Sequence, residues 1–219
     1  MEKSQFLKYG VSSVHILSHI IEPQPTPAPF EERQDILFIG SILFDPSPNG
    51  DAVRYFLNQI LPLVRQKLTC QFLVVGTNRI KSIWNLESSS VHVVGQVEDL
   101  TPYYNRSRLF VVPTRFSAGI PLKLLEATAH GLPAVVTPLT ARQLGWQENH
   151  DLLVGNTPED FARKVIDLYT NPALWHSLRH NALARLQQEY SPLHFANTLT
   201  SILHTTRDRA STEKNRTVA

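Results

Sequence analysis

Residues 113–137 read PTRFSAGIPLKLLEATAHGLPAVVT. The apolar run 109–112 just before them predicts a buried β-strand that ends where this stretch begins. After a loop of small residues, we expect a helix over about 120–130, with Pro121 in its first turn. A second short apolar run, 134–136, predicts the next strand. Strand, helix and strand in this order form a βαβ unit, which makes an α/β fold the first expectation.

The same alternation continues on both sides of this stretch. Apolar runs without in–out alternation, each closed by a glycine, predict four more buried strands at 36–39, 72–75, 91–94 and 152–154. Helical patterns lie at 49–67, with Asn49 as the expected N-cap, and at 80–86, 100–105, 161–169, 172–190 and 192–204. Buried strands separated by helices indicate a parallel sheet covered on both faces. Right-handed crossovers then predict a single Rossmann-like, doubly wound domain over residues 35–206, with a helical C-terminus.

The two ends of the chain are expected to lie outside this domain. Residues 22–29 read EPQPTPAP, and alternate prolines favour an extended segment. Residues 1–34 are therefore interpreted as an N-terminal segment and a proline-rich linker, which either ties the domain to another one or crosses its surface. Residues 207–219 are polar and rich in charge, and we expect a disordered tail there.

Composition excludes several classes of protein. The formal net charge of +2 gives no electrostatic case for nucleic acid as a partner. The one cysteine, Cys70, rules out an intrachain disulfide and opens an apolar run, so we expect a buried thiol and a reducing, cytoplasmic setting. No signal peptide precedes residue 10, and no apolar stretch approaches the length of a membrane-spanning helix. We predict no metal site, and the sequence lacks the glycine loops of NTPases and dehydrogenases and the hydrolase nucleophile elbow.

The start of the helix at 120–130 has the features of an anion site. Backbone N–H groups at a helix N-terminus attract anions, and Gly119 lets a phosphate approach without a Cβ in the way. Gly119, Lys123 and Glu126 are spaced four and three residues apart, so they share one helix face, next to an apolar face with Leu122 and Leu125. The lysine suits a diphosphate, and the carboxylate suits two vicinal ribose hydroxyls. An ordinary solvated Lys–Glu pair remains the alternative.

Residues 124–137, LLEATAHGLPAVVT, resemble the signature of the retaining GT-B glycosyltransferases called glycosyl transferases group 1. The family pattern runs Leu-Leu-Glu-Ala-x-Ala-x-Gly-x-Pro-Val-Val-x-Thr. Shorter resemblances occur at 38–41, 48–50, 72–76, 91–100, 151–154 and 158–161, so the likeness spans about residues 36–191. It implies the C-terminal, donor-binding domain of such an enzyme.

The resemblance assigns roles to ten residues of this sequence. Glu126 would bind the ribose, and Lys123 matches the lysine of the subgroup whose loop reads Gly-x-Gly-Ile-x-x-Lys. Arg115 is a weaker candidate for phosphate, and a surface role for it stays open. The remaining contacts would come from the backbone or from lining positions: Gly119 and Ile120 for the diphosphate, Gly95, Gln96 and Val97 for the nucleobase, and Gly40 and Ser41 for the sugar-phosphate side.

Two positions depart from the family pattern. Many members carry a glutamate eight residues before the ribose-binding one, and this chain has Ala118 there. Several members also carry an arginine and a lysine just after the first strand, whereas residues 40–44 read GSILF. These departures leave the identity of the donor open and increase the weight on Lys123.

The resemblance implies a function in which this chain is one half of a catalyst. It would bind a nucleotide-diphosphate sugar for transfer to a saccharide or lipid acceptor, with retention of configuration and without a metal or other cofactor. The acceptor would bind to an N-terminal GT-B domain supplied in cis or in trans, with membrane contact through that half. The alternatives are a non-catalytic nucleotide-sugar-binding module and, less favoured, a sugar-nucleotide epimerase.

Overall fold

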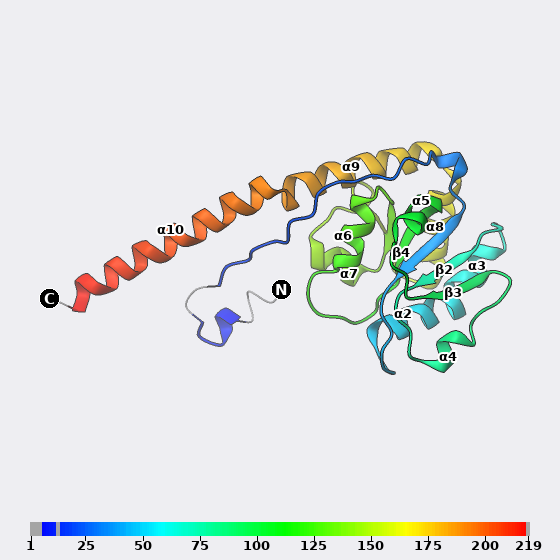
Figure 1. Cartoon of the computed structure of the whole chain (residues 1–219), viewed down its shortest axis with the longest axis horizontal. Coiled ribbons are helices and arrows are strands. Elements are labelled where there is room, and N and C mark those ends of the chain that lie inside the picture. Colours follow the sequence, from blue (N-terminus) through cyan, green and yellow to red (C-terminus); the bar gives the residue numbers. More distant parts are fainter. Residues whose placement is uncertain (1–5, 12–13, 218–219) are drawn as a thin grey trace. The chain divides into compact units, whose positions relative to one another are not determined.

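The computed structural model describes residues 6–11 and 14–217. The chain divides into two compact units, Pro23–Arg185 and a smaller one formed by Met1–Glu22 with Leu186–Ala219. The larger unit contains the whole sheet (Figure 1).

The sheet has six parallel strands in the order β3-β2-β1-β4-β5-β6. Their bounds are Asp35–Ile39 (β1), Phe72–Val75 (β2), Val91–Gly95 (β3), Ser107–Val112 (β4), Ala134–Val136 (β5) and Leu153–Val154 (β6). The strand order reverses between β1 and β4, and ligands bind in such sheets at the carboxyl ends of the strands beside the reversal. The predicted α/β fold, a Rossmann-like parallel sheet with a helical C-terminus, is confirmed.

Burial along the strands follows their place in the sheet. Every residue of β1 and β2 is buried, because helices cover both faces of a doubly wound sheet. Strand β3 alternates between buried and half-buried positions, since it forms one edge of the sheet. The continuous apolar runs of the sequence are thus strands with two covered faces.

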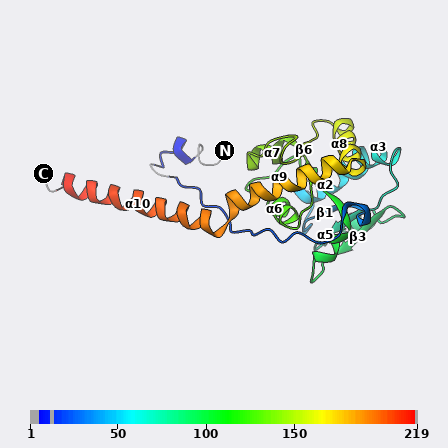
Figure 2. The same ribbon diagram turned by 90° about the horizontal axis from the view of Figure 1, so that it is seen from above.

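The helices of the larger unit fill the intervals between strands. Their bounds are Pro48–Tyr55 (α2), Leu61–Arg65 (α3), Lys81–Trp84 (α4), Thr101–Arg106 (α5), Leu122–Ala129 (α6), Pro138–Leu144 (α7) and Pro158–Thr170 (α8), with the 3-10 turn Phe30–Glu32 (η1) before β1. Helix α9, Pro172–Tyr190, extends from the larger unit into the smaller one. Helices α3 and α8 lie side by side in both views (Figures 1 and 2).

The helix expected over 49–67 differs from the prediction in two ways. Its N-cap is Ser47, whose hydroxyl accepts from the N–H of Gly50 at 3.2 Å, so Asn49 lies inside the first turn. A π-helical segment, Phe56–Ile60 (η2), also separates α2 from α3. Pro62 has no N–H for the usual helical bond, and the wider π turn accommodates it.

Two further helices differ from expectation. Helix α6 begins at Leu122, so Pro121 precedes the helix, where it was expected in the first turn. Leu122 was expected on the apolar face of this helix, but it is exposed, and Leu124 is fully buried instead. Helix α7 had no counterpart among the predicted elements.

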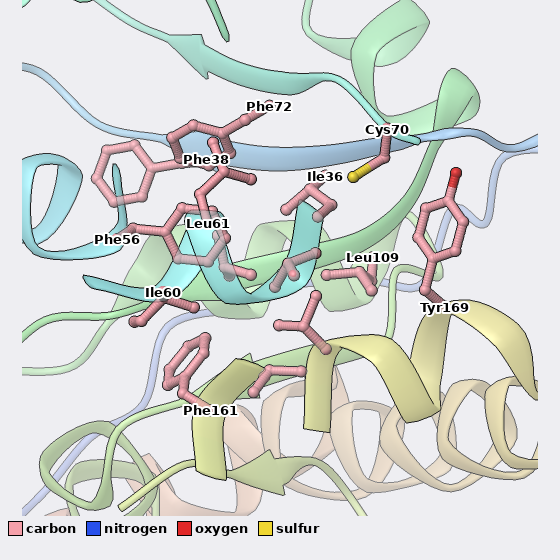
Figure 3. Close-up of a cluster of buried hydrophobic side chains, with 14 of the residues drawn as sticks. Ile36, Phe38, Phe56, Ile60, Leu61, Cys70, Phe72, Leu109, Phe161 and Tyr169 are labelled. Atoms are coloured by element: carbon pink, nitrogen blue, oxygen red, sulfur yellow. The ribbon is translucent and has the colours of Figure 1, made fainter. Parts of the chain in front are cut away.

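One large hydrophobic cluster lies between the sheet and the layer formed by α2, α3 and α8 (Figure 3). Within it, the ring of Phe56 packs against two others, with centroid distances of 4.5 Å to Phe72 on β2 and 6.2 Å to Phe161 on α8. Cys70 borders the cluster and is 8% exposed, which confirms the expected buried thiol.

The proline-rich segment crosses the surface of the larger unit. Gln24 N donates to Ala129 O at 2.8 Å, and Thr26 N donates to His130 O at 3.1 Å. Ala28 N donates to the Asn105 side chain at 3.0 Å. Of the two interpretations left open by the sequence, these bonds support the surface crossover, and the unit begins at Pro23 instead of residue 35.

The smaller unit contains a long C-terminal helix, Pro192–Thr217 (α10), and an extended segment in which Ile21 N donates to Tyr190 O at 2.9 Å. The helical backbone continues through residues 207–217, where we had expected a disordered tail, and residues 218–219 lie outside the described range. The run 207–217 contains neither glycine nor proline, so nothing in it interrupts a helix. Within the described part of the chain, every helix is too short or too polar to span a membrane.

Candidate functional site

The ends of β1 and β2 approach each other closely at the point where the site was expected. Gly76, which follows β2, has a φ of +132°, and a Cβ added there would lie 2.6 Å from Gly40 O. Gly40, which follows β1, is crowded from the other side, because its own Cβ would lie 2.8 Å from the side-chain Cγ of Asn49. Both glycines are therefore needed for the packing of the strand ends.

Lys123 reaches this point from the start of α6. Its Nζ donates to Asn49 Oδ1 and lies 4.6 Å from the centroid of the Phe38 ring, within cation–π range. The Asn49 amide in turn donates to Ser41 O at 2.8 Å. Burial lowers the pKa of the Lys123 ammonium to about 8. The loop after β1, helix α2 and helix α6 thus meet at one cation.

Arg115 lies in the loop after β4, where it is held by α2. Its guanidinium donates to both carboxylate oxygens of Asp51, at 3.0 and 2.5 Å, and lies 4.6 Å from the Tyr55 ring centroid. Hydrogen bonding to Asp51 raises the pKa of Arg115. The arginine therefore sits beside the site already engaged in an ion pair.

The loop before α6 leaves space on one side of its backbone. Gly119 has a φ of +82°, and a Cβ built there would meet nothing within 4 Å. Pro121, with φ −77° and ψ 74°, forms an inverse γ-turn in which Leu122 N donates to Ile120 O at 2.9 Å. This turn explains why the helix begins two residues later than predicted.

Glu126 lies one turn beyond Lys123 on α6, and its side chain is exposed. Behind it, the ring of Tyr104 stacks on His130 with centroids 4.1 Å apart. Burial, and next the charge of Glu126, raise the pKa of the Tyr104 phenol. The carboxylate is thus accessible to a ligand.

The turn after β3 is shaped by an aromatic residue of α4. Gly95 has a φ of +82°, and a Cβ there would lie 2.9 Å from Cη2 of Trp84. The Thr77 hydroxyl donates to the Gln96 side chain at 3.1 Å, which joins this turn to the end of β2. Val97 follows as a half-buried residue of the same turn.

The structure links part of the predicted set directly. Asn49 connects Ser41, beside Gly40, with Lys123, and Arg115 is attached to the same helix through Asp51. Gly95, Gln96 and Val97 lie two strands away, at the end of β3. Sequence reasoning missed Asn49 as a site residue because its contact with Lys123 spans 74 positions and leaves no local pattern.

Two pairs of histidines, His15 with His19 and His176 with His180, have the i, i+4 spacing that a helix would bring together. Among the residues that the structure describes, no group of three His, Cys, Asp or Glu side chains is gathered as metal binding requires.

Comparison with known proteins identifies the family. Residues 33–171 match the family model described as "Glycosyl transferases group 1". An uncharacterized 44.6 kDa protein of the cps region of Klebsiella pneumoniae is 24% identical over 166 residues, which cover 71% of this chain and 42% of that protein. An uncharacterized glycosyltransferase of Haemophilus influenzae is 30% identical over 103 residues, 46% of this chain and 28% of that protein. The matched regions thus span less than half the length of these curated relatives.

Solved structures agree at the level of the fold. S. aureus TarM, in a complex that contains UDP, has a TM-score of 0.76 at 16% identity, over 91% of this chain and 41% of TarM. The C-terminal domain of a glycosyl transferase group 1 protein, LpcC from Francisella tularensis, has a TM-score of 0.62 at 13% identity, over 79% of this chain and 97% of that domain. The chain therefore belongs to the glycosyl transferases group 1 family and has the fold of a GT-B C-terminal domain.

Proposed function

We propose that this chain binds a nucleotide-diphosphate sugar and is the donor half of a glycosyltransferase that acts on a saccharide or lipid acceptor. The observation that carries the proposal is the Lys123 ammonium at the start of α6, next to the strand reversal between β1 and β4. A cation and a helix N-terminus at that position attract a diphosphate. Family membership and the UDP in the TarM complex support the same ligand class.

The nucleotide would extend from the turn after β3 to the start of α6. The backbone of Gly95, Gln96 and Val97 would contact the base, and the exposed Glu126 carboxylate would accept hydrogen bonds from two ribose hydroxyls. Gly40 and Ser41 would line the sugar-phosphate side. The N–H groups of Gly119 and Ile120 would face the diphosphate, where Gly119 leaves open space.

In the reaction, the bond between the sugar and the diphosphate breaks, and negative charge grows on the leaving nucleotide. Lys123 and the N-terminus of α6 would stabilise that charge, and the reaction would need no metal ion. Arg115 would contribute little to diphosphate binding, because Asp51 already pairs with its guanidinium. The retention of configuration at the sugar and the contacts with the acceptor would depend on a second, N-terminal GT-B domain. The whole enzyme would be cytoplasmic and would contact the membrane through that domain.

A non-catalytic nucleotide-sugar-binding module is the second candidate. Ala118 stands where many family members place a glutamate, and the loop after β1 lacks the usual arginine and lysine. Such a module would bind the nucleotide and turn over no donor, even with an acceptor domain present.

Calorimetry with UDP, GDP and ADP tests the binding half of the proposal. At least one should bind, and Glu126→Gln should weaken it about 10- to 100-fold by removing charge-assisted hydrogen bonds to the ribose. Pyrophosphate, which has no ribose, should bind equally well to the variant. If none of the three nucleotides binds, the proposal is wrong. Donor hydrolysis by the chain, alone and fused to an acceptor domain, then separates a transferase from a module.

A further inference from the structure

The centre of the site has a positive charge that no acid neutralises. Asp51 on α2 is engaged by Arg115, and Asp45 in the loop after β1 is engaged by Arg54 through bonds of 2.9 and 2.5 Å. Among the described residues, no carboxylate lies within ion-pair distance of Lys123. The group that faces this cation is the neutral amide of Asn49.

The orientation of that amide is fixed by its other contacts. The Asn49 Nδ2 donates to Ser41 O at 2.8 Å, so the carbonyl oxygen of the same amide must point to Lys123. Gly40 makes room for this arrangement, because a Cβ there would lie 2.8 Å from Asn49 Cγ. Gly40 has no left-handed φ, so the close contact with the amide is the reason for glycine at this position.

We infer that Asn49 is a positioning residue for Lys123. Its amide oxygen holds the ammonium at the strand reversal and favours the protonated form, and it places no negative charge beside the cation. An amide oxygen stabilises the ammonium by a hydrogen bond but adds no negative charge that would repel a phosphate. A carboxylate in the same place would form a partly buried ion pair and cancel the cation. An apolar side chain would leave the half-buried ammonium without its acceptor and favour the neutral amine.

These alternatives make opposite predictions for the protonation of Lys123. Its pKa is held at about 8 by burial, below the ordinary value. Asn49→Asp should raise that pKa, and Asn49→Ala should lower it further. Gly40→Ala, which displaces the amide, should act in the same direction as Asn49→Ala. All three variants leave the other charged groups on the surrounding elements unchanged. These groups are Asp45, Asp51, Arg54, Arg115 and Glu126.

The test is the pH dependence of Lys123 labelling by an amine reagent in the folded chain, read by peptide mass spectrometry. The control is Asn58→Asp, which adds the same charge to an exposed position of the π segment η2. We expect the labelling midpoint to rise in Asn49→Asp, to fall in Asn49→Ala and Gly40→Ala, and to stay unchanged in the control. If the midpoint in Asn49→Asp equals that of the control, the inference is overturned.

A second measurement concerns anion binding and rests on the proposed function. With inorganic pyrophosphate as the probe at pH 7.5, Asn49→Asp should lose about 10- to 100-fold in affinity, because the charge-assisted bond from Lys123 is cancelled. Asn58→Asp should lose little. Equal losses in the two variants would contradict the positioning role. A wild-type chain that binds neither pyrophosphate nor any of UDP, GDP and ADP would instead refute the proposed function and leave the labelling result intact.

Discussion

Arg33 is a fully buried cation whose removal should weaken the whole larger unit. Its guanidinium donates to the carbonyl oxygens of Ala28 (2.8 Å), Tyr104 (2.7 Å), Ser107 (3.1 Å) and Thr26 (3.1 Å), and to the Thr26 hydroxyl (2.9 Å). Burial, and next the charge of Arg179, lower its pKa to about 10. The side chain therefore stays charged and joins the proline-rich segment to α5 and β4.

Arg33→Met keeps the length of the side chain and removes every donor. The carbonyl oxygens of Ala28, Tyr104 and Ser107 would each lose the donor that Arg33 supplies, while Thr26 O keeps its 3.0 Å bond from Arg179. Three unsatisfied carbonyls at about 1–3 kcal/mol each, less the recovered cost of burying a charge, give a loss of about 3–5 kcal/mol. For a unit of this size, such a loss lowers Tm by about 6–20 °C.

Denaturant and thermal unfolding of the intact chain measure this loss. The matched control is Arg163→Met, because Arg163 is 62% exposed at the side chain and pairs with Asp160 at the surface. The control should cost at most about 1 kcal/mol. A loss in Arg33→Met no greater than in Arg163→Met would refute the argument that the buried guanidinium holds the crossing segment.

Three other predictions concern single groups. Ser47→Ala should cost about 1 kcal/mol in denaturant unfolding by removing the α2 cap, and an unchanged midpoint would mean that the cap contributes nothing. Burial raises the pKa of the Cys70 thiol to about 11. Iodoacetamide at pH 8 should therefore alkylate Cys70 rapidly in the unfolded chain and slowly in the folded chain, and equal rates would contradict this. The affinity for UDP, measured by calorimetry, should fall as pH rises through about 8, because Lys123 is charged below its pKa and neutral above it. A flat profile from pH 7 to 9.5 would show that this charge is not used.

The sheet was predictable because its signal is local. Each central strand is a short apolar run, three of the four are followed by a glycine or proline, and two covered faces require such runs. Pro158, Pro172 and Pro192 are the first residues of α8, α9 and α10, and proline in the first turn is a start signal that the sequence shows directly. Pro48 carried the same signal for α2, and it would have identified Ser47 as the cap in place of Asn49.

The contacts of the site were less predictable because they join distant parts of the chain. Lys123 and Glu126 follow from the spacing on one helix, but the bond from Lys123 to Asn49 depends on how α2 and α6 meet across the strand reversal. The ion pair of Arg115 with Asp51 spans 64 positions in the same way. The short helix α7 was not predicted, although Thr137 and Pro138 carry the same N-cap and first-turn signals as the residues at the start of α8.

Helix α6 is fixed at both ends, and this explains how so short an element can position a ligand site. At its C-terminal end, Ala129 O and His130 O accept the N–H groups of Gln24 and Thr26, and Arg179 donates to Gly131 O at 2.7 Å. These bonds satisfy carbonyls that a helix end leaves without partners.

At the other end of α6, the Lys123 side chain is tied to α2 through Asn49, while Leu124 and Leu125 are fully buried. A helix held in this way cannot turn about its axis without breaking polar contacts at one end or the packing of its buried side. The backbone positions of Lys123 and Glu126 are therefore fixed relative to each other, as the proposed binding of a diphosphate and a ribose requires. The proline-rich segment thus helps to fix the helix that carries Lys123 and Glu126.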